Sequence, residues 1–211
     1  MPSSLIWIQQ LGGIRVTNIT AVILAAGKSS RMGVPSKALA HLDGQTVLSR
    51  IVGRLDNQVE RIVINGRKTI FDSQNLPIIE DKTTAFSGPL AGLYSAMSDP
   101  LLGATRKILI VPCDSPFLPL DLVSVLDIAL GQSDVACVRY KGVLQPTFSL
   151  WNKRVDKKVS SSLLEQGNGG FKPLLSSLDT TVVDWPEQAV DPFFNINTVE
   201  DLRIAEENLW H

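Results

Sequence analysis

The sequence predicts an α/β fold in which helices cover a mainly parallel sheet. Short apolar runs alternate with longer amphipathic segments along all 211 residues, which is the pattern of such folds. Runs such as Ile108–Val111 are apolar throughout, as expected of strands buried on both faces. The chain is 44% hydrophobic, which suits one compact domain with a sizeable core.

We expect strands at residues 19–25, 61–65, 76–80, 107–112, 134–139, 146–151 and 181–184. We expect helices at residues 47–55, 89–98, 121–130, 153–165, 171–178 and 199–209. In the last of these, Val199, Leu202 and Leu209 lie near one face, as in an amphipathic helix. Ligands of open parallel sheets bind at the carboxyl ends of the strands, so a site is expected there.

Residues 18–211 are expected to form the single domain, and residues 1–17 an appendage to it. The apolar run Leu5–Ile8 is short and no Lys or Arg precedes it, so it makes a poor signal peptide. No run approaches the ~18 apolar residues of a membrane span. With a net charge of −1, the chain has no overall basic field for nucleic acid or membranes. Its two cysteines and two histidines lack metal-ligand spacing, which argues against a structural zinc site. Two cysteines do not make a disulfide framework, so the cytoplasm is the expected compartment.

A loop of small residues and cations, Leu24–Gly33, follows the first predicted strand, and Lys37 lies four residues further on. Small residues let backbone N–H groups approach phosphates, and cations offset their charge. The loop is not a P-loop, because Val22 stands where that motif needs glycine. It is not a dinucleotide fingerprint either, because Gly27 and Gly33 have no third partner. A flexible turn with surface cations remains an equal alternative for the loop taken alone.

Asp114 follows the strand expected at residues 107–112. A carboxylate at a strand's carboxyl end beside a phosphate loop is well placed to hold Mg²⁺, which prefers oxygen ligands. The alternative is that Asp114 caps a helix starting near Pro119. Its neighbour Cys113 has no histidine nearby in sequence, so a buried small side chain is expected there rather than a nucleophile.

Three further polar segments fall at predicted strand or helix ends. Asn65 and Glu80–Asp81 follow apolar strands, where they could read a base or ribose or simply form turns. Gly88–Gly92 opens a helix, and Gly88 would let a ligand approach its free N–H groups. Residues 193–198 precede the last helix, with Asn197 or Thr198 as the expected cap.

Taken together, these motifs resemble the molybdenum cofactor guanylyltransferases. The matching segments are Leu-Ala-Ala-Gly-x3-Arg-Met-Gly with Lys37, then Asn65, Glu80–Asp81, Gly88-Pro-Leu-Ala-Gly, Pro-Cys-Asp114-Ser-Pro and Phe194-Asn-Ile-Asn-Thr, over residues 19–209. The resemblance implies a three-layer α/β/α Rossmann-like nucleotidyltransferase fold. It also implies transfer of GMP from Mg²⁺-GTP to the phosphate of molybdopterin, with release of pyrophosphate.

The resemblance also implies the role of each site residue. Leu24, Ala25, Ala26 and Gly27 would line the nucleotide. Arg31 and Lys37 would contact its phosphates, Asn65 and Asp81 would hold the guanosine, and Asp114 would bind nucleotide and Mg²⁺. Asn195 and Asn197 would lie near the acceptor. Arg31, Lys37 and Asp114 are therefore the predicted catalytic residues, and the implied partners include other cofactor-biosynthesis proteins and acceptor molybdoenzymes.

Two positions depart from the family pattern. Ser36 replaces an acidic residue that relatives often have before the lysine, and Lys172 is the nearest cation where relatives often carry arginine, near residues 167–172. The second departure bears on the identity of the acceptor. The alternatives are therefore a cytidylyltransferase or a nucleotidyltransferase for another phosphate, and a non-catalytic protein that delivers a nucleotide or cofactor.

Overall fold

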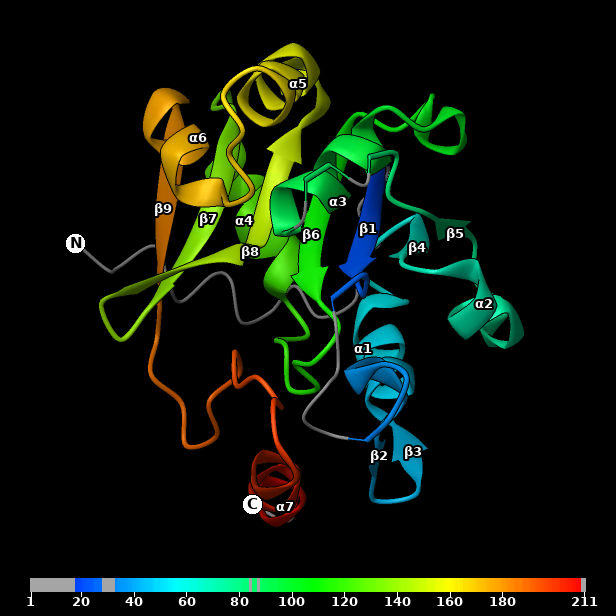
Figure 1. The fold of residues 1–211 in the computed structure, drawn as a ribbon. Helices are drawn as coiled ribbons and strands as arrows, with labels where there is room; N and C mark the ends of the chain where they lie inside the picture. Colours follow the sequence, from blue (N-terminus) through cyan, green and yellow to red (C-terminus); the bar gives the residue numbers. More distant parts are fainter. Residues whose placement is uncertain (1–17, 28–32, 84, 87, 210–211) are drawn as a thin grey trace, which may run out of the picture.

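The computed structural model describes residues 18–27, 33–83, 85–86 and 88–209, so the expected appendage at residues 1–17 lies outside the described residues. Its centre is a seven-stranded sheet in the order β5-β4-β1-β6-β8-β7-β9 (Figure 1). The strands are β1 (Ile19–Leu24), β4 (Arg61–Asn65), β5 (Ile78–Ile79), β6 (Lys107–Pro112), β7 (Val135–Tyr140), β8 (Val143–Asn152) and β9 (Thr180–Trp185).

Every strand of this sheet except β8 runs in the same direction. β8 is antiparallel to both β6 and β7, while β7 and β9 are parallel to each other. The central strand β1 pairs with β4 and β6, and Leu24 at its carboxyl end lies beside both Asn65 and Pro112. The expected mainly parallel sheet is confirmed, and its register brings three of the predicted site segments to one edge.

Helices cover both faces of the sheet. One buried cluster joins the sheet to α1 (Val47–Leu55), α4 (Leu122–Leu130) and α7 (Val199–Asn208). A second cluster, on the other face, joins it to α3 (Pro89–Met97), α5 (Asp156–Leu164) and α6 (Phe171–Ser177). Consecutive residues of β1 alternate between the clusters, with Ile23 in the first and Val22 in the second. The three-layer α/β/α arrangement is therefore confirmed (Figure 1).

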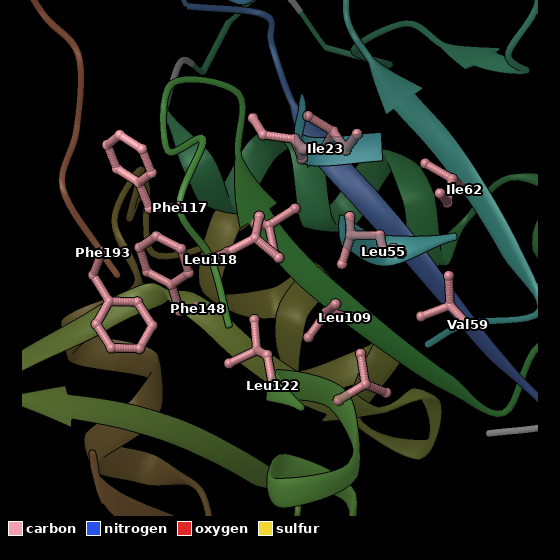
Figure 2. Packing of buried hydrophobic residues seen from close by; sticks show 14 of the residues in the cluster. Ile23, Leu55, Val59, Ile62, Leu109, Phe117, Leu118, Leu122, Phe148 and Phe193 are labelled. Carbon is pink, nitrogen blue, oxygen red and sulfur yellow. The ribbon is translucent and has the colours of Figure 1, made fainter. Parts of the chain in front are cut away.

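Aromatic side chains belong to the first cluster and pack next to the segment that precedes α7. Phe193 packs edge-on against Phe148, with the ring centroids 4.8 Å apart, and Figure 2 shows both rings beside Phe117. Burying large aromatic side chains contributes strongly to stability. This packing fixes the chain just before the predicted acceptor segment at residues 195–197.

Short elements differ most from the sequence expectation. The hairpin of β2 (His41–Leu42) and β3 (Gln45–Thr46) and the one-turn helix α2 (Lys68–Phe71) were not expected. The strand expected at residues 76–80 is only the two residues of β5, and the helix expected at 153–165 starts as a 3₁₀ turn, Lys153–Val155. Further 3₁₀ turns lie at Lys37–Leu39, Asp72–Gln74 and Pro100–Leu102. Among the described residues, no helix is long and apolar enough to cross a membrane.

Candidate active site

The carboxyl ends of β1, β4 and β6 are tied together by backbone hydrogen bonds. The N–H of Ala25 donates to the Asn65 carbonyl at 2.7 Å, and the N–H of Cys113 donates to the Leu24 carbonyl at 3.2 Å. Ala26 and Gly27 then turn outward and are exposed. The loop thus starts from a fixed base, while Arg31, together with the rest of residues 28–32, lies outside the described residues.

Lys37, Asp114 and Asn197 come together at this edge from three distant parts of the chain. The Lys37 Nζ donates to Asp114 Oδ2 at 3.2 Å and also to Asn197 Oδ1. Lys37 begins the 3₁₀ turn Lys37–Leu39, and the buried Ser36 caps that turn by accepting from the Ala38 N–H. The departure at position 36 therefore has a structural role, because a serine hydroxyl satisfies the start of the turn.

Asp114 is largely buried beside this lysine, with its side chain 15% exposed. Burial raises the pKa of Asp114, and the nearby Lys37 ammonium acts in the opposite direction. Among the described residues, Asp114 Oδ1 is buried and has no hydrogen-bond partner. A buried carboxylate oxygen without a partner is costly, and a hard cation such as Mg²⁺ would satisfy it. The helix-capping alternative is wrong, since α4 begins at Leu122 with Asp121 at its N-cap.

No described group of three or more His, Cys, Asp and Glu side chains could hold a metal. Asp114 is thus the one predicted ligand, in keeping with the habit of Mg²⁺ of taking its remaining oxygens from water and substrate phosphates. The neighbouring Cys113 is unsuited to nucleophilic attack, because burial raises the pKa of its thiol to about 12.

The segment before α7 delivers both predicted acceptor residues to the same place. The Ile196 N–H donates to the Asp114 carbonyl at 2.8 Å, and the Ser115 hydroxyl donates to Asn195 Oδ1 at 2.7 Å. Thr198 then caps α7 in a reciprocal box with Asp201, as one of the two expected caps. Ser115 is fully buried, and its role could not be predicted from the sequence, although it directly follows Asp114 in the Pro-Cys-Asp-Ser-Pro motif.

Asn65 and Asp81 form a second group at the ends of β4 and β5. The Asn65 Nδ2 donates to Asp81 Oδ1 at 2.9 Å and to the Ile79 carbonyl at 3.2 Å. Glu80 turns away instead, and its Oε1 accepts from the N–H of Lys68 at the start of α2. The two residues expected to hold guanosine are therefore in contact with each other.

The start of α3 is not the open anion site that its glycine suggested. The N–H of Leu90 donates to the Gly169 carbonyl at 3.2 Å. A methyl group on Gly88, whose φ is +117°, would lie 2.6 Å from that same oxygen. Gly88 therefore admits the loop at residues 166–170 rather than a ligand. Lys172, just past this loop, is exposed.

Comparisons with a family model and with curated proteins lead to the same family. Residues 21–182 match the family model described as the MobA-like NTP transferase domain. The molybdenum cofactor guanylyltransferase of Rhodopseudomonas palustris (strain BisB5) is 35% identical in an alignment over 194 residues that covers 88% of this chain and 91% of that protein. The enzyme of the same name from Yersinia pestis (strain Pestoides F) is 34% identical over 192 residues, 90% of this chain and 96% of that protein.

Solved structures share the fold at lower identity. The molybdopterin-guanine dinucleotide biosynthesis protein A of Archaeoglobus fulgidus matches with a TM-score of 0.75 and 19% identity, covering 90% of this chain and 98% of that one. The 4-diphosphocytidyl-2C-methyl-D-erythritol synthase of Anaerococcus prevotii matches with a TM-score of 0.66 and 16% identity, covering 92% and 96%. Since these two proteins carry the names of different nucleotides, the shared fold alone does not select the base.

Proposed function

Since the chain belongs to the family of MobA-like NTP transferases, we propose that it transfers GMP from GTP to the phosphate of molybdopterin. The product is the guanine dinucleotide form of the molybdenum cofactor, and pyrophosphate is released. The observation that carries the proposal is the convergence of Lys37, Asp114 and Asn197 beside the loop after β1. The names of the relatives at 34–35% identity support the choice of GTP and of the acceptor.

In this reaction an oxygen of the acceptor phosphate attacks the α-phosphorus of GTP. The bond from that phosphorus to the pyrophosphate oxygen breaks, and pyrophosphate leaves with the bonding electron pair. The attacking phosphate is already ionised near neutral pH, so no general base is required. Two anions must be brought together, and positioning and charge neutralisation therefore supply most of the catalysis.

The side chains at the site suit these tasks. Lys37, together with Arg31, would offset the charge of the triphosphate, and Leu24–Gly27 would line the nucleotide with backbone groups. Asp114 would hold Mg²⁺ through the oxygen that has no partner among the described residues. When bound, the metal would neutralise phosphate charge.

The orientation of the Asn195 side-chain amide indicates how the acceptor phosphate would be bound. Because the Ser115 hydroxyl occupies the Oδ1 of Asn195, the Nδ2 of that amide is the group left to donate to an anion. Asn197, held by Lys37, would lie on the same side. We place the reaction in the cytoplasm, where both cysteines would stay as thiols, and propose cofactor-biosynthesis proteins and acceptor molybdoenzymes as further partners.

The test is release of pyrophosphate by the purified chain with Mg²⁺, molybdopterin and each of GTP, CTP and ATP. We expect rapid pyrophosphate release with GTP and not with CTP or ATP. Faster release with CTP would make the chain a cytidylyltransferase. Nucleotide binding without pyrophosphate release from any of the three would support the delivery-protein alternative and refute the enzymatic proposal.

A further inference from the structure

A hollow of about 420 Å³ lies on the face of the sheet that α1, α4 and α7 cover, and it is lined by none of the site residues that the structure describes. Its walls come from the end of α1, the connection between β6 and α4, the segment between β9 and α7, and the end of α7. The apolar part of the wall is formed by Phe117, Pro119, Leu120, Val190, Pro192 and Leu209, and Leu120 is 67% exposed. A concave apolar surface with a few polar groups is typical of a binding site.

Hydrogen bonds between α1 and the β6–α4 connection hold these walls in place. The Gln58 Nε2 donates to the carbonyls of Arg54 and Pro119. The Gln58 Oε1 accepts from the Val123 N–H at 2.9 Å. The Arg54 Nη1 donates to the Leu118 carbonyl at 3.0 Å. The hollow is therefore formed before a ligand arrives, which lowers the ordering cost of binding.

Arg54 brings a positive charge to this hollow. Its neighbour Arg50 pairs with Asp43 at 3.6 Å, whereas Arg54 forms no ion pair with a carboxylate of the described residues and bonds to the Leu118 carbonyl. Burial lowers the pKa of Arg54, and the charge of Arg50 acts in the same direction. A guanidinium carries five N–H donors in a planar fork that fits a carboxylate, and the bond to Leu118 uses one of its three nitrogens. The hollow is thus complementary to an anion that also has an apolar part.

The hollow is built from two chain segments that also build the candidate active site. Phe117 lies three residues after Asp114, and Pro192 lies three residues before Asn195. Figure 2 shows Phe117 beside Phe193, which belongs to the same segment as Asn195. A protein bound in the hollow would therefore lie next to the segments that position the expected metal and acceptor.

We propose that this hollow is a docking site for a partner protein, and that it binds a segment in which an apolar side chain and a carboxylate side chain are neighbours. The carboxylate would pair with Arg54 through two parallel hydrogen bonds, and the apolar side chain would pack against Phe117 and Leu120. The charge of Arg54 selects against a cationic segment. Docking goes beyond the proposed function and needs no nucleotide; only the exchange of substrate or product with the docked partner rests on that function.

The experiment titrates the whole chain with blocked tetrapeptides that carry Leu-Asp or Asp-Leu at their centre, and it follows the Nε–Hε NMR signal of Arg54. The comparison peptides have Asn in place of Asp, or Ser in place of Leu. We expect the better Leu/Asp peptide to shift the signal and to bind about tenfold more tightly than its Asn counterpart, as is typical of a hydrogen bond between charged groups. It should also bind at least about fivefold more tightly than its Ser counterpart. The Asp preference should fall as salt rises from about 0.05 M to about 0.5 M.

Variants at the charged positions test the role of Arg54. Arg54→Met should remove the preference for Asp over Asn. Asp121→Asn removes an acidic side chain that also lines the hollow, so it should strengthen binding of the Asp peptide at low salt. Arg61→Met is the matched control, because Arg61 likewise donates to a backbone carbonyl, that of Leu101 at 2.8 Å, but begins β4 and does not line the hollow. It should leave every affinity unchanged.

Variants at two exposed positions test the apolar wall. Leu120→Ser should weaken binding of the Leu/Asp peptides by about fivefold. Ile128→Ser is its control, because Ile128 is 62% exposed on α4 but does not line the hollow, and it should change nothing. Equal effects of the two substitutions would overturn the assignment of the apolar side chain to this hollow.

The remaining outcomes separate a partner protein from other occupants. Equal binding of the Asp and Asn peptides by the wild type, or an Asp preference that persists in folded Arg54→Met, overturns the proposal. If the chain self-associates in sedimentation and Arg54→Met abolishes the association, the occupant is a second copy. If phenylacetate binds as tightly as the Leu/Asp peptides, the occupant is a small molecule. Either result overturns docking of a partner protein.

Two further measurements keep the test decisive. Should Arg54→Met not fold, Arg54→Lys keeps the charge but loses the planar fork, and it should lower the Asp preference at least about threefold; an unchanged preference overturns the paired carboxylate. Arg54→Met should release pyrophosphate from GTP and molybdopterin at the wild-type rate, because the purified substrates need no docked partner. Loss of peptide binding with normal turnover therefore tests docking alone, whereas a wild type without turnover tests the proposed function alone.

Discussion

Replacing Asp114 with asparagine should remove most of the turnover and leave the protein at least as stable as the wild type. The substitution keeps the shape of the side chain and its ability to accept a hydrogen bond from Lys37. It removes the negative charge that Mg²⁺ requires. Loss of a principal electrostatic element at a reacting centre costs about 10²- to 10³-fold in kcat, and we expect a loss in that range.

The expected stability follows from two opposing effects at the same carboxylate. At the 3.2 Å separation of Lys37 Nζ and Asp114 Oδ2, the Coulomb attraction is about 5 kcal/mol at an effective dielectric constant of ~20. Burial of the charge opposes it, and because the pKa of Asp114 is raised, burial is the larger effect. Asparagine at this position avoids the free-energy cost of burying the charge. We therefore expect the Tm of Asp114→Asn to equal or exceed that of the wild type, and for a chain of this size each kcal/mol shifts Tm by about 2–4 °C.

The assay combines pyrophosphate release at saturating GTP and molybdopterin with a thermal unfolding scan of each protein. Asp121→Asn is the matched control, because Asp121 lies on the same β6–α4 connection, at the N-cap of α4, without a side-chain capping bond. It should keep wild-type turnover. A folded Asp114→Asn protein that retains near-normal kcat would refute the metal assignment. A drop in Tm of more than ~4 °C would show that the Lys37–Asp114 attraction outweighs burial.

Two further predictions test the surroundings of this carboxylate, and a third tests the ion pairs that Asp134 forms with Arg154 and Lys158. Lys37→Met should lower kcat/KM for GTP and, unlike Asp114→Asn, also lower Tm, because it leaves a buried charge unpaired at a cost of about 3–5 kcal/mol; equal Tm values for the two variants would contradict this. Ser115→Ala should lower kcat/KM for molybdopterin by about tenfold with GTP affinity unchanged, because Asn195 loses the hydroxyl that orients it; a loss confined to GTP would contradict the acceptor assignment. Asp134→Asn should lower the unfolding free energy at pH 7 by about 1–2 kcal/mol without affecting turnover. Burial acts to raise the pKa of Asp134, but hydrogen bonds from its two basic partners lower it overall. The stability it contributes is therefore present above the ordinary Asp pKa and is lost as the pH falls through the folded-state value, below about 4. Urea unfolding at pH 7 and pH 3 checks this, and a wild-type advantage that is equal at both pH values would contradict it.

The sequence predicts the central strands of the fold because they are apolar on both faces. β1, β4 and β6 lie within a residue of their expected bounds, since a continuous apolar run has few alternatives to a buried strand. The rule that ligands bind at strand carboxyl ends then gathers Leu24, Asn65 and Asp114 at one edge. Family membership supports the nucleotidyltransferase activity, while the role of each side chain stays a prediction.

The finer features could not be read from the sequence because they depend on contacts between distant residues. Lys37 reaches Asn197 across 160 positions, and no local pattern announces that bond. Gly88 resembled an open helix start, but a loop some 80 residues later fills it. β5 and α2 are too short for periodicity to identify, and they exist because β4 and Glu80 provide partners for their backbone groups.

The polar side chains at this edge share one arrangement, which explains how a chain with a net charge of −1 can bind two anions. Ser115 holds Asn195 and Asn65 holds Asp81, each through one oxygen of the held group, so the remaining polar atoms have fixed directions before any substrate arrives. Preorganised groups need no reorientation at the moment of reaction, and this makes them effective in catalysis. Asp114 shows the cost of the arrangement, because its second oxygen is buried without a partner among the described residues. Such a group lowers the stability of the free protein, and binding a substrate-borne cation would recover that loss. The site should therefore be the part of the fold that gains most from Mg²⁺-GTP.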